Sequence, residues 1–261
     1  MEYNFNAKIQ KELVVKWIRA WFDQNGPTSP AVLGISGGKD STVAAALCVE
    51  ALGKDRVIGV MMPNNVQHDI NDSVAVCEHL GIRYLTVDIH DAVQGVLNNI
   101  DAIFIPERDG YEDVTFTQQT MNNLPPRIRM ATLYAVSQSF NGRVVNTCNL
   151  SETMIGWETR WGDAVGDFSP LADLTASEVV AIGLECDIPK YLVVKTPADG
   201  LCGKTDEDAF GFTYAQFDSV IRGGVAPIDV MARIDKMING SVFKRREIPK
   251  YVSGLKNYCN Y

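Results

Sequence analysis

The sequence predicts an α/β fold with a doubly wound parallel sheet and helical additions. The first observation is that short apolar runs alternate with segments whose apolar residues recur at helical spacing. The second is that Gly, Asn and Pro separate these runs, as expected where strands and helices are joined by short turns. Alternating strands and helices imply βαβ units with parallel strands and right-handed crossovers.

The N-terminal half accounts for most of the expected sheet. Residues 8–24 have helical apolar spacing, and Asn25-Gly26-Pro27 ends that helix. Gly53 and Gly81 each follow a helical segment and are expected to terminate it. The elements expected after the first helix are a strand at 31–35, a helix at 42–52, a strand at 57–62, a helix at 69–80, a strand at 84–87 and a helix near 91–99.

The pattern is lost over residues 101–121, which are expected to form a loop. Thr175 and Glu178 form a capping-box signature at the start of a later helix. The elements expected in this half are a helix from Pro125-Pro126 to about Ser139, a strand at 144–147, a helix at 176–185 and a helix at 227–238. No clear linker separates them, so we expect a single domain over residues 1–261.

Composition excludes several classes of function. Hydrophobic residues make up 46% of the chain and charged residues 21%, which is ordinary for a globular protein with a buried core. The net charge of −8 argues against a nucleic-acid-binding surface. No apolar run is long enough to span a membrane, and the N-terminus lacks the apolar core of a signal peptide. The six cysteines form no C-x-x-C pair, so we expect reduced thiols in a cytoplasmic protein.

The stretch GISGGKDS, residues 34–41, lies between an expected strand and an expected helix. It does not match the P-loop signature G-x-x-x-x-G-K-[ST], but it is placed at the sheet edge where ligands bind in open α/β folds. Glycine amides and a helix N-terminus there can hold a phosphate. Asp40 within such a cradle suggests a magnesium ion between carboxylate and phosphate. The alternative is a tight turn in which Asp40 is only a favourable charge at a helix start.

A second group of polar residues follows the expected strand at 144–147. It contains two tryptophans, an arginine and several carboxylates, and Arg127 on the preceding helix is a further cation in an acidic chain. Each residue alone could be part of a capped loop or a solvated surface. Their density after a sheet strand favours a second substrate lying against the nucleotide site.

S-G-G-x-D-S, residues 36–41, resembles the pyrophosphate loop of the N-type ATP pyrophosphatase superfamily, whose fold is adenine nucleotide alpha-hydrolase-like. From the first helix to about Pro249, the chain resembles the ammonia-dependent NAD synthetases. The motifs that carry this resemblance, in order, are Arg127–Met130, Thr147–Glu152, Gly156–Asp163, Pro170–Thr175, Pro197–Leu201, Asp206–Tyr214 and Lys244-Arg245-Arg246.

The resemblance implies a ligase that amidates deamido-NAD (nicotinic acid adenine dinucleotide) with ammonia to NAD, through an acyl-adenylate, with release of AMP and pyrophosphate. It implies ATP binding by Gly34, Ile35, Ser36, Gly37, Gly38, Lys39, Asp40, Ser41, Gln67 and Thr147, and Mg²⁺ binding by Asp40 and Glu152. It implies deamido-NAD binding by Asn123, Arg127, Trp157, Arg160, Asp163, Asp167, Lys244 and Arg245. Asp163 or Asp167 is the candidate to bind ammonium or accept its proton, and Asp40 belongs to the catalytic set. The family resemblance also implies a homodimer with the deamido-NAD site at its interface.

The chain departs from the family pattern at four positions, and at two of these Met61 stands where an arginine is usual and Arg160 where a lysine is usual. Ala176 stands where a lysine usually reaches the ATP phosphates, and Ala198 stands where Ser or Thr is common. Lys39 and Lys195 are the candidates to replace the missing charge. Two alternatives stay open: another ATP pyrophosphatase that amidates or thiolates a different acceptor, and a catalytically weakened nucleotide-binding homologue. Only about thirty residues precede the first strand, so we expect free ammonia, or ammonia from a separate protein, as the nitrogen source.

Overall fold

A four-stranded parallel sheet forms the centre of the protein. The computed structural model describes residues 3–67, 70–103, 116–194 and 205–253. The strands are β1 (Ala31–Gly34), β2 (Val57–Met61), β3 (Arg83–Thr86) and β4 (Arg143–Val144). Their order is β3-β2-β1-β4, and every pair is parallel. An isolated parallel bridge between Val145 and Phe168 continues the pairing beyond β4.

The strand order places a topological switch point between β1 and β4. The chain first builds the sheet from β1 to β2 and β3, and then returns to the other side of β1 with β4. The loops that leave β1 and β4 therefore diverge from neighbouring strands, which is where open α/β sheets bind ligands.

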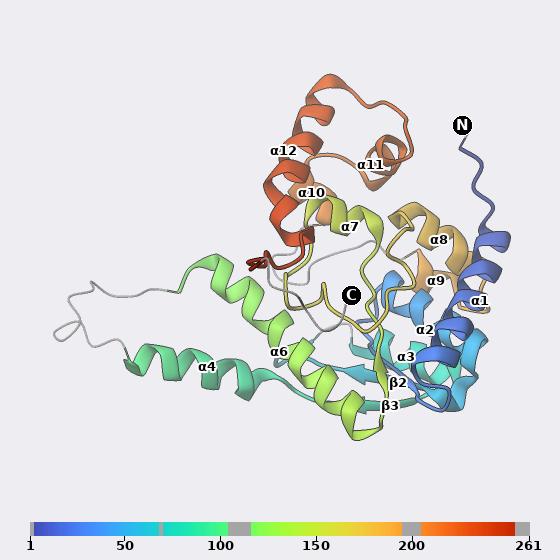
Figure 1. The fold of residues 1–261 in the computed structure, drawn as a ribbon, viewed down its shortest axis with the longest axis vertical. Helices are drawn as coiled ribbons and strands as arrows, with labels where there is room; N and C mark the ends of the chain where they lie inside the picture. The colour runs from blue at the N-terminus through green and yellow to red at the C-terminus, as the bar shows by residue number, and fades with distance from the viewer. Residues whose placement is uncertain (1–2, 68–69, 104–115, 195–204, 254–261) are drawn as a thin grey trace.

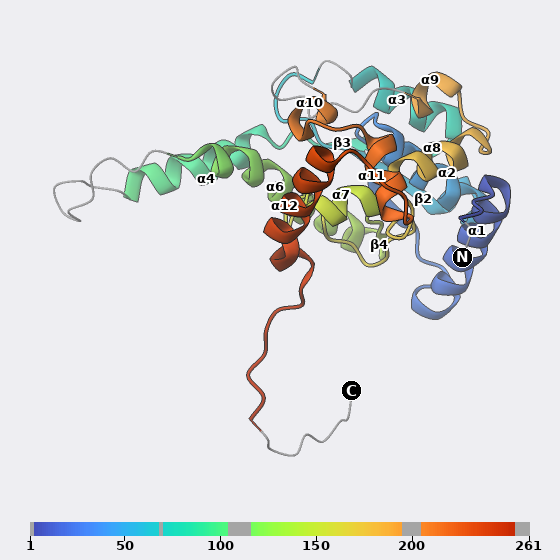
Figure 2. The same cartoon turned by 90° about the horizontal axis from the view of Figure 1, so that it is seen from above.

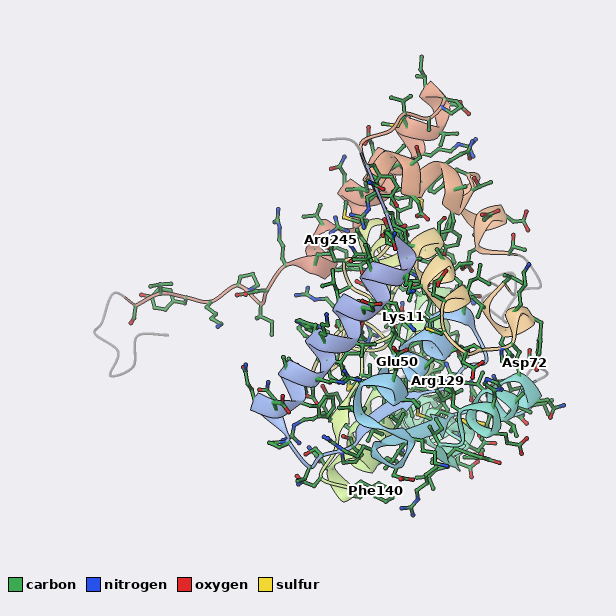
Figure 3. The ribbon with its side chains drawn as sticks, turned by 90° about the vertical axis from the view of Figure 1, so that its right-hand side faces the viewer. Lys11, Glu50, Asp72, Arg129, Phe140 and Arg245 are labelled. Atoms are coloured by element: carbon green, nitrogen blue, oxygen red, sulfur yellow. The ribbon has the colours of Figure 1, made fainter. Side chains whose placement is uncertain are left out.

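One face of the sheet is covered by α1 (Ala7–Asn25), α2 (Lys39–Leu52), α3 (Ile70–Leu80), α8 (Ala176–Leu184) and α9 (Lys190–Val193). Leu33 of β1 points into this layer and is fully buried with Ile18, Leu47 and Ile182. A salt bridge of 3.0 Å between Lys11 and Glu50 joins α1 to α2 at the surface (Figure 3). The short 3₁₀ helix η1 (Lys54–Arg56) connects α2 to β2.

The opposite face is covered by α4 (His90–Ile103) and α6 (Gln118–Ser139), which lie side by side and project from the body (Figures 1 and 2). Val32 and Val60 point to this side and pack with Val93 and Leu133. Strand side chains alternate between the two faces, so successive apolar residues fill two separate cores. Helices on both faces of a parallel sheet confirm the doubly wound α/β architecture.

A third apolar cluster lies away from the sheet. It is formed by α7 (Leu150–Ile155), α10 (Asp206–Phe210), α11 (Tyr214–Ile221) and α12 (Ile228–Arg245), together with the start of α8 (Figure 1). Phe217 and Ile234 are fully buried at its centre. These are the helical additions to the α/β core.

Several element boundaries differ from the sequence predictions. The helix expected to begin at Pro125-Pro126 begins at Gln118, because the Thr117 side chain caps it by accepting a hydrogen bond from the Thr120 amide. The two prolines lie inside α6, where they remove two backbone donors without ending the helix. Residues 101–103 belong to α4 and 118–121 to α6, so the loop expected at 101–121 was wrong at both ends. Residues 104–115 lie outside the described part of the chain.

Other predictions were close but shorter or longer than the observed elements. The strand expected at 144–147 is only Arg143–Val144 plus the bridge at Val145. The helix expected at 42–52 begins at Lys39, and the helix expected at 227–238 extends to Arg245. Within the described residues, no helix has both the length and the apolar character needed to cross a bilayer.

Phe168 is expected to be the main anchor between α1 and the sheet edge. Its buried ring stacks on Trp21 at a centroid distance of 4.6 Å and meets the edge of Phe22 at 5.3 Å. Phe168→Ala should lower the free energy of unfolding in urea by about 3–5 kcal/mol, since it leaves a cavity in a packed core. Tyr251→Ala, at a position 92% exposed, is the control and should leave the unfolding midpoint unchanged. Equal midpoints for both variants would contradict this assignment.

Candidate active site

The loop after β1 lies so close to the start of α3 that its turn at Gly37 has no space for a side chain. Gly37 has a φ of 77°, and a Cβ there would lie 3.1 Å from the amide nitrogen of Ser73 and 3.2 Å from its Oγ. A side chain at this position would therefore be both strained and crowded. The Ser73 hydroxyl is buried and has no hydrogen-bond partner in the structure. An uncommitted polar group therefore lies next to the backbone of Gly37.

Two serine side chains hold the loop in its turn. The Gly38 amide donates to Ser36 Oγ at 3.2 Å, and Ser36 Oγ lies 3.1 Å from Ser41 Oγ. The Thr42 hydroxyl donates to the Gly38 carbonyl at 2.7 Å. These bonds fix the backbone of the stretch at residues 34–41, which we call the pyrophosphate loop.

The start of α2 offers donors to an anion. The cap residue is Gly38, which has no side chain to accept from the first-turn amides. These amides and the positive end of the helix dipole favour a negatively charged ligand. Lys39 and Asp40 already belong to the helix, so the sequence prediction placed the helix start three residues too late. The amides of Lys39, Asp40 and Ser41, which were expected to face the anion, therefore belong to the first turn of α2.

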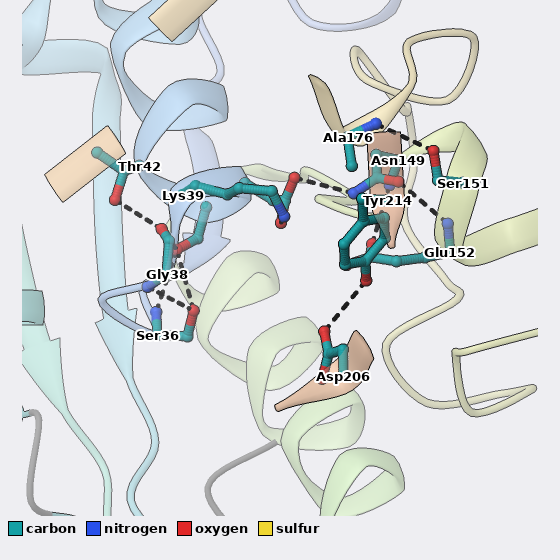
Figure 4. A network of polar contacts seen from close by, with 12 residues as sticks. Ser36, Gly38, Lys39, Thr42, Asn149, Ser151, Glu152, Ala176, Asp206 and Tyr214 are labelled. Atoms are coloured by element: carbon teal, nitrogen blue, oxygen red, sulfur yellow. Dashed lines mark hydrogen bonds and ion pairs between the residues drawn. The ribbon is translucent and has the colours of Figure 1, made fainter. Parts of the chain in front are cut away.

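Asp40 and Glu152, the two expected magnesium ligands, are brought together by Asn149 (Figure 4). Asn149 Nδ2 donates to Asp40 Oδ1 at 3.0 Å, and the Asn149 amide donates to Glu152 Oε2 at 3.1 Å. Asp40 comes from α2 after β1, and Glu152 comes from α7 after β4, so the pair spans the switch point. Burial and the nearby charge of Asp40 raise the pKa of Glu152 well above its usual value.

This donor set suits Mg²⁺ bound together with phosphate. Mg²⁺ prefers oxygen ligands and is usually held by one or two carboxylates plus substrate phosphates and water. Among the described residues, no three His, Cys, Asp or Glu side chains gather as a complete metal site. Asp40 and Glu152 therefore fit a metal whose remaining ligands come from the nucleotide and solvent.

Lys39 lies beside this pair. Its Nζ is 2.7 Å from Asp40 Oδ2, and it faces the ring of Tyr214 at 5.4 Å from the centroid. Burial opposes the charge of Lys39, but the carboxylates of Asp40 and Glu152 outweigh that effect and raise its pKa. The Tyr214 hydroxyl in turn donates to Asp206 Oδ2 at 3.1 Å.

Four of the expected acceptor residues are joined through the loop at 157–163. Thr159 Oγ1 donates to Asn123 Oδ1 at 2.7 Å, and the Thr159 amide donates to Asp163 Oδ1 at 2.8 Å. Arg127 Nε donates to the Arg160 carbonyl at 3.3 Å. We call Asn123, Arg127, Arg160 and Asp163 the acceptor cluster. Burial raises the pKa of Asp163, although its backbone hydrogen bonds oppose the shift.

Arg160 is partly committed to other groups. Its Nη2 donates to the Arg246 carbonyl at 3.1 Å, and its guanidinium lies 4.8 Å from the Trp161 ring centroid. Its Nε is buried without a hydrogen-bond partner. One donor of the acceptor cluster therefore remains available to a ligand without breaking an existing bond.

Lys244 and Arg245 bind the protein's own backbone. Lys244 Nζ donates to the carbonyls of Gly156 and Glu158, both at 2.7 Å. Arg245 Nη1 donates to the Met154 carbonyl at 2.7 Å and to Ser241 Oγ at 2.8 Å. In this conformation the two cations fasten the end of α12 to the end of α7 and the loop that follows it.

Asp167 is placed differently from Asp163. Its Oδ2 accepts from the Val144 amide at 2.7 Å, and its Oδ1 accepts from the Tyr134 hydroxyl at 3.2 Å. These bonds tie the carboxylate to β4 and α6, whereas Asp163 is tied to Thr159. The two candidate ammonium-binding aspartates are therefore held by different partners in the structure.

Trp157, Thr147 and Gln67 are the remaining expected site residues in the described part of the chain. Trp157 meets Phe210 edge-on at 4.7 Å and keeps part of its ring exposed. Thr147 is half-buried just beyond the bridge at Val145, and Gln67 is half-buried next to residues 68–69, which are not described. Lys195, Ala198 and the motif Pro197–Leu201 also lie outside the described residues.

Sequence reasoning missed two residues that organise the site. Asn149 lies within the Thr147–Glu152 motif, and its N-x-x-E spacing to Glu152 is a capping-box signature that could have revealed its local role. Tyr214 belongs to the Asp206–Tyr214 motif, but no local pattern indicates that it contacts Lys39, which is 175 positions earlier in the chain. Only the folded chain brings them together.

Glu152 should destabilise the metal-free protein at neutral pH. Its folded-state pKa is raised above 4.5, the usual value, so folding binds protons and stability falls as pH rises above that value. Glu152→Gln keeps the capping acceptor and removes the charge. In urea unfolding with a chelator at pH 7, it should be more stable than the parent, with the gain shrinking as pH falls toward 4.5. Glu12→Gln, on an exposed part of α1, should show no such gain. A stability loss in Glu152→Gln at pH 7 would contradict the electrostatic argument.

Comparison with known proteins agrees with this geometry. A sequence profile described as NAD synthase matches residues 10–249. An NH(3)-dependent NAD(+) synthetase from Pyrococcus furiosus is 32% identical over 230 residues, which cover 82% of this chain and 85% of that protein.

Two solved structures share the fold over nearly their whole length. An NMN synthetase from Francisella tularensis has a TM-score of 0.83 at 32% identity and covers 95% of this chain and 99% of its own. An NAD+ synthetase from Burkholderia pseudomallei has a TM-score of 0.73 at 28% identity, and the match covers 93% of this chain and 91% of that protein. The profile match at residues 10–249 includes the pyrophosphate loop, the carboxylate pair and the acceptor cluster, and this chain belongs to the NAD synthase family.

Proposed function

We propose that the protein is a ligase that forms the amide of NAD from deamido-NAD, ammonia and ATP, through an acyl-adenylate, with release of AMP and pyrophosphate. The observation that carries this proposal is the meeting of Asp40 and Glu152 through Asn149, beside the open N-terminus of α2. This arrangement suits the binding of a departing pyrophosphate together with a metal.

The pyrophosphate loop would bind the β- and γ-phosphates of ATP. The amides at the start of α2 and the hydroxyls of Ser36 and Ser41 supply neutral donors, which stabilise negative charge without repelling the metal. When bound by Asp40 and Glu152, Mg²⁺ supplies positive charge that offsets the charge developing on pyrophosphate. Thr147, at the end of β4, is placed to contact the nucleotide from the other side of the switch point.

The acceptor cluster would bind the second substrate. Arg127 and Arg160 are suited to phosphate and carboxylate groups, because guanidinium can donate two parallel hydrogen bonds. The exposed part of the Trp157 ring can stack on a pyridinium ring. Positioning the pyridine carboxylate beside ATP lets its oxygen attack the α-phosphate, so no nucleophilic side chain is needed.

Asp163 is the better placed of the two aspartates to receive a proton from ammonium. It belongs to the acceptor cluster, and burial raises its pKa, which brings a carboxylate nearer to the range useful for a base. Asp167 is engaged by Val144 and Tyr134, so its part in the site is to position β4 against α6. Lys244 and Arg245 would act on the acceptor indirectly, by holding α12 over the end of α7.

The proposal extends to assembly and location. A homodimer would use the projecting pair α4 and α6, which carries Asn123 and Arg127 of the acceptor cluster (Figure 2). All four cysteines in the described residues are free thiols, which suits a cytoplasmic protein.

A second candidate acceptor is the mononucleotide that corresponds to deamido-NAD, nicotinate mononucleotide. The observation that favours it is the TM-score of 0.83 to an NMN synthetase, compared with 0.73 for the Burkholderia NAD+ synthetase. Both acceptors present the same pyridine carboxylate, and they differ in the adenylate half. The amidation chemistry at the ATP site would be identical.

A turnover assay separates these proposals. The protein, Mg²⁺, ATP and ammonium are incubated with deamido-NAD or with nicotinate mononucleotide, and AMP, pyrophosphate and the amidated product are quantified. We expect AMP and pyrophosphate in equal amounts with product, and a higher kcat/KM for deamido-NAD. A higher kcat/KM for the mononucleotide would replace the first acceptor by the second. Formation of ADP and phosphate would contradict the acyl-adenylate mechanism for both.

Asp40→Asn should lower kcat by about 10²-fold or more, because it removes a charge that holds the metal against the phosphates. The fold should be kept, since asparagine can still accept the hydrogen bond from Asn149. Asp55→Asn, on the exposed η1, is the matched control and should keep full activity. Steady-state kinetics with circular dichroism checks both variants, and an active Asp40→Asn protein would exclude the proposed metal role.

A further inference from the structure

Lys39 is a buried cation at the point where a metal is expected to bind. Its side chain is only 6% exposed, although it is a lysine in the first turn of a helix. Its Nζ lies 2.7 Å from Asp40 Oδ2, while Asp40 Oδ1 is occupied by Asn149. The ammonium therefore holds the one oxygen of Asp40 that this pairing with Asn149 leaves open.

A lysine and a magnesium ion are competitors for this oxygen. Two cations within contact distance of one carboxylate oxygen repel each other strongly in a partly buried site. Glu152 and Asp206 are two further carboxylates that act on the charge of Lys39, and Asn149 holds Glu152 in the same group as Asp40. Before any metal enters, Lys39 is thus the positive charge that balances the repulsion between Asp40 and Glu152.

The surroundings give the displaced ammonium a place to go. Lys39 is the residue directly after the cap Gly38, so its stem starts beside the amides expected to hold phosphate. Its Nζ faces the ring of Tyr214, which stabilises a cation without binding it to one fixed acceptor. A short rotation of the four-carbon stem can therefore exchange a carboxylate for a phosphate oxygen.

The neighbourhood of Ala176 is part of the same arrangement. Ala176 is buried in the cluster that contains Tyr214. Its backbone N–H is already engaged, because it donates to Ser151 Oγ at 3.0 Å (Figure 4). Ala176, the first residue of α8, thus contributes an uncharged methyl group on the side of the site where Tyr214 lies. Lys39 reaches the same ring from α2.

We propose that Lys39 is an exchanging cation of the ATP site: in the metal-free protein it neutralises Asp40 and Glu152, and on binding of Mg·ATP it yields Asp40 to the metal and pairs with the β- or γ-phosphate. This inference rests on the proposed function for the identity of the nucleotide. It assigns to Lys39 two successive partners, a carboxylate and then a phosphate. A purely structural lysine would keep the same partner throughout.

Binding measurements with Lys39→Met test the exchange. Methionine has a similar length and no charge, so the competitor for Asp40 is lost. Calorimetric titration with Mg²⁺ alone should show an affinity roughly tenfold or more above that of the parent protein. Titration with the non-hydrolysable analogue α,β-methylene-ATP and Mg²⁺ should show an affinity roughly tenfold or more below that of the parent, because a charged phosphate contact is missing.

Two further variants keep the result interpretable. Lys39→Arg retains the charge and should bind the analogue more tightly than Lys39→Met does. Lys11→Met removes a lysine from another salt bridge, with Glu50, and should change neither affinity. Thermal unfolding of each variant verifies that the folded protein is the species titrated.

The possible outcomes separate this inference from the proposed function. Opposite shifts of the two affinities in Lys39→Met support the exchange, and they support it even if the parent protein does not amidate deamido-NAD. If the parent binds the analogue and Lys39→Met alters neither affinity, the exchange is excluded while the proposed function stands. Weaker binding of both Mg²⁺ and the analogue would also overturn the exchange, because removing a competitor for Asp40 cannot lower the affinity for Mg²⁺.

Discussion

The site depends on one fully buried side chain, Asn149, which ties two distant loops together. Its Nδ2 holds Asp40, its amide holds Glu152 Oε2, and its Oδ1 accepts from the Glu152 amide at 3.0 Å. Asn149 is also the cap of α7, so the residue that starts the helix also orients the carboxylate on its first turn. Two carboxylates this close repel each other, and the bonds from Asn149 together with the charge of Lys39 offset that repulsion.

The sheet provides the rigid frame on which this contact is built. Val32 and Leu33 of β1 point to opposite apolar cores, so the strand cannot shift register without exposing one of them. The loops after β1 and β4 leave this frame at its switch point, where the polar groups are no longer confined by either core. A nucleotide site at this edge therefore combines a fixed backbone with donors that are free to bind.

The C-terminal helices complete the site from outside the sheet. Tyr214 on α11 faces Lys39, and Lys244 and Arg245 on α12 bind carbonyls at and beyond the end of α7. These contacts join α11 to α2 and α12 to α7 and the loop that follows it. Lys244 also binds the Glu158 carbonyl, so it fastens the loop that carries Arg160 and Asp163 of the acceptor cluster.

Local patterns in the sequence were sufficient to predict the architecture and the chemical class of the site. Alternating strands and helices predicted the doubly wound sheet, and GISGGKDS predicted a phosphate-binding turn after β1. Thr175-x-x-Glu178 predicted a capping box, which the structure confirms at the start of α8. Each of these signals is contained within a few residues, because backbone periodicity, caps and turns are local. The prolines at 125 and 126 misled the prediction, since the cap at Thr117 and the packing of α6 override their tendency to begin a helix.

By itself, then, the sequence determined the order of strands and helices along the chain, the loop proposed to bind phosphate and the residue types available to a metal and an acidic acceptor. Only the tertiary structure decided which of those residues meet. It paired Asp40 with Glu152 through Asn149, placed Lys39 beside both Asp40 and Tyr214, and gave Asp163 and Asp167 different partners. The physical reason is that these contacts join residues far apart in the chain. Which donor reaches which acceptor depends on how the two cores pack around the sheet, and no local pattern encodes that packing.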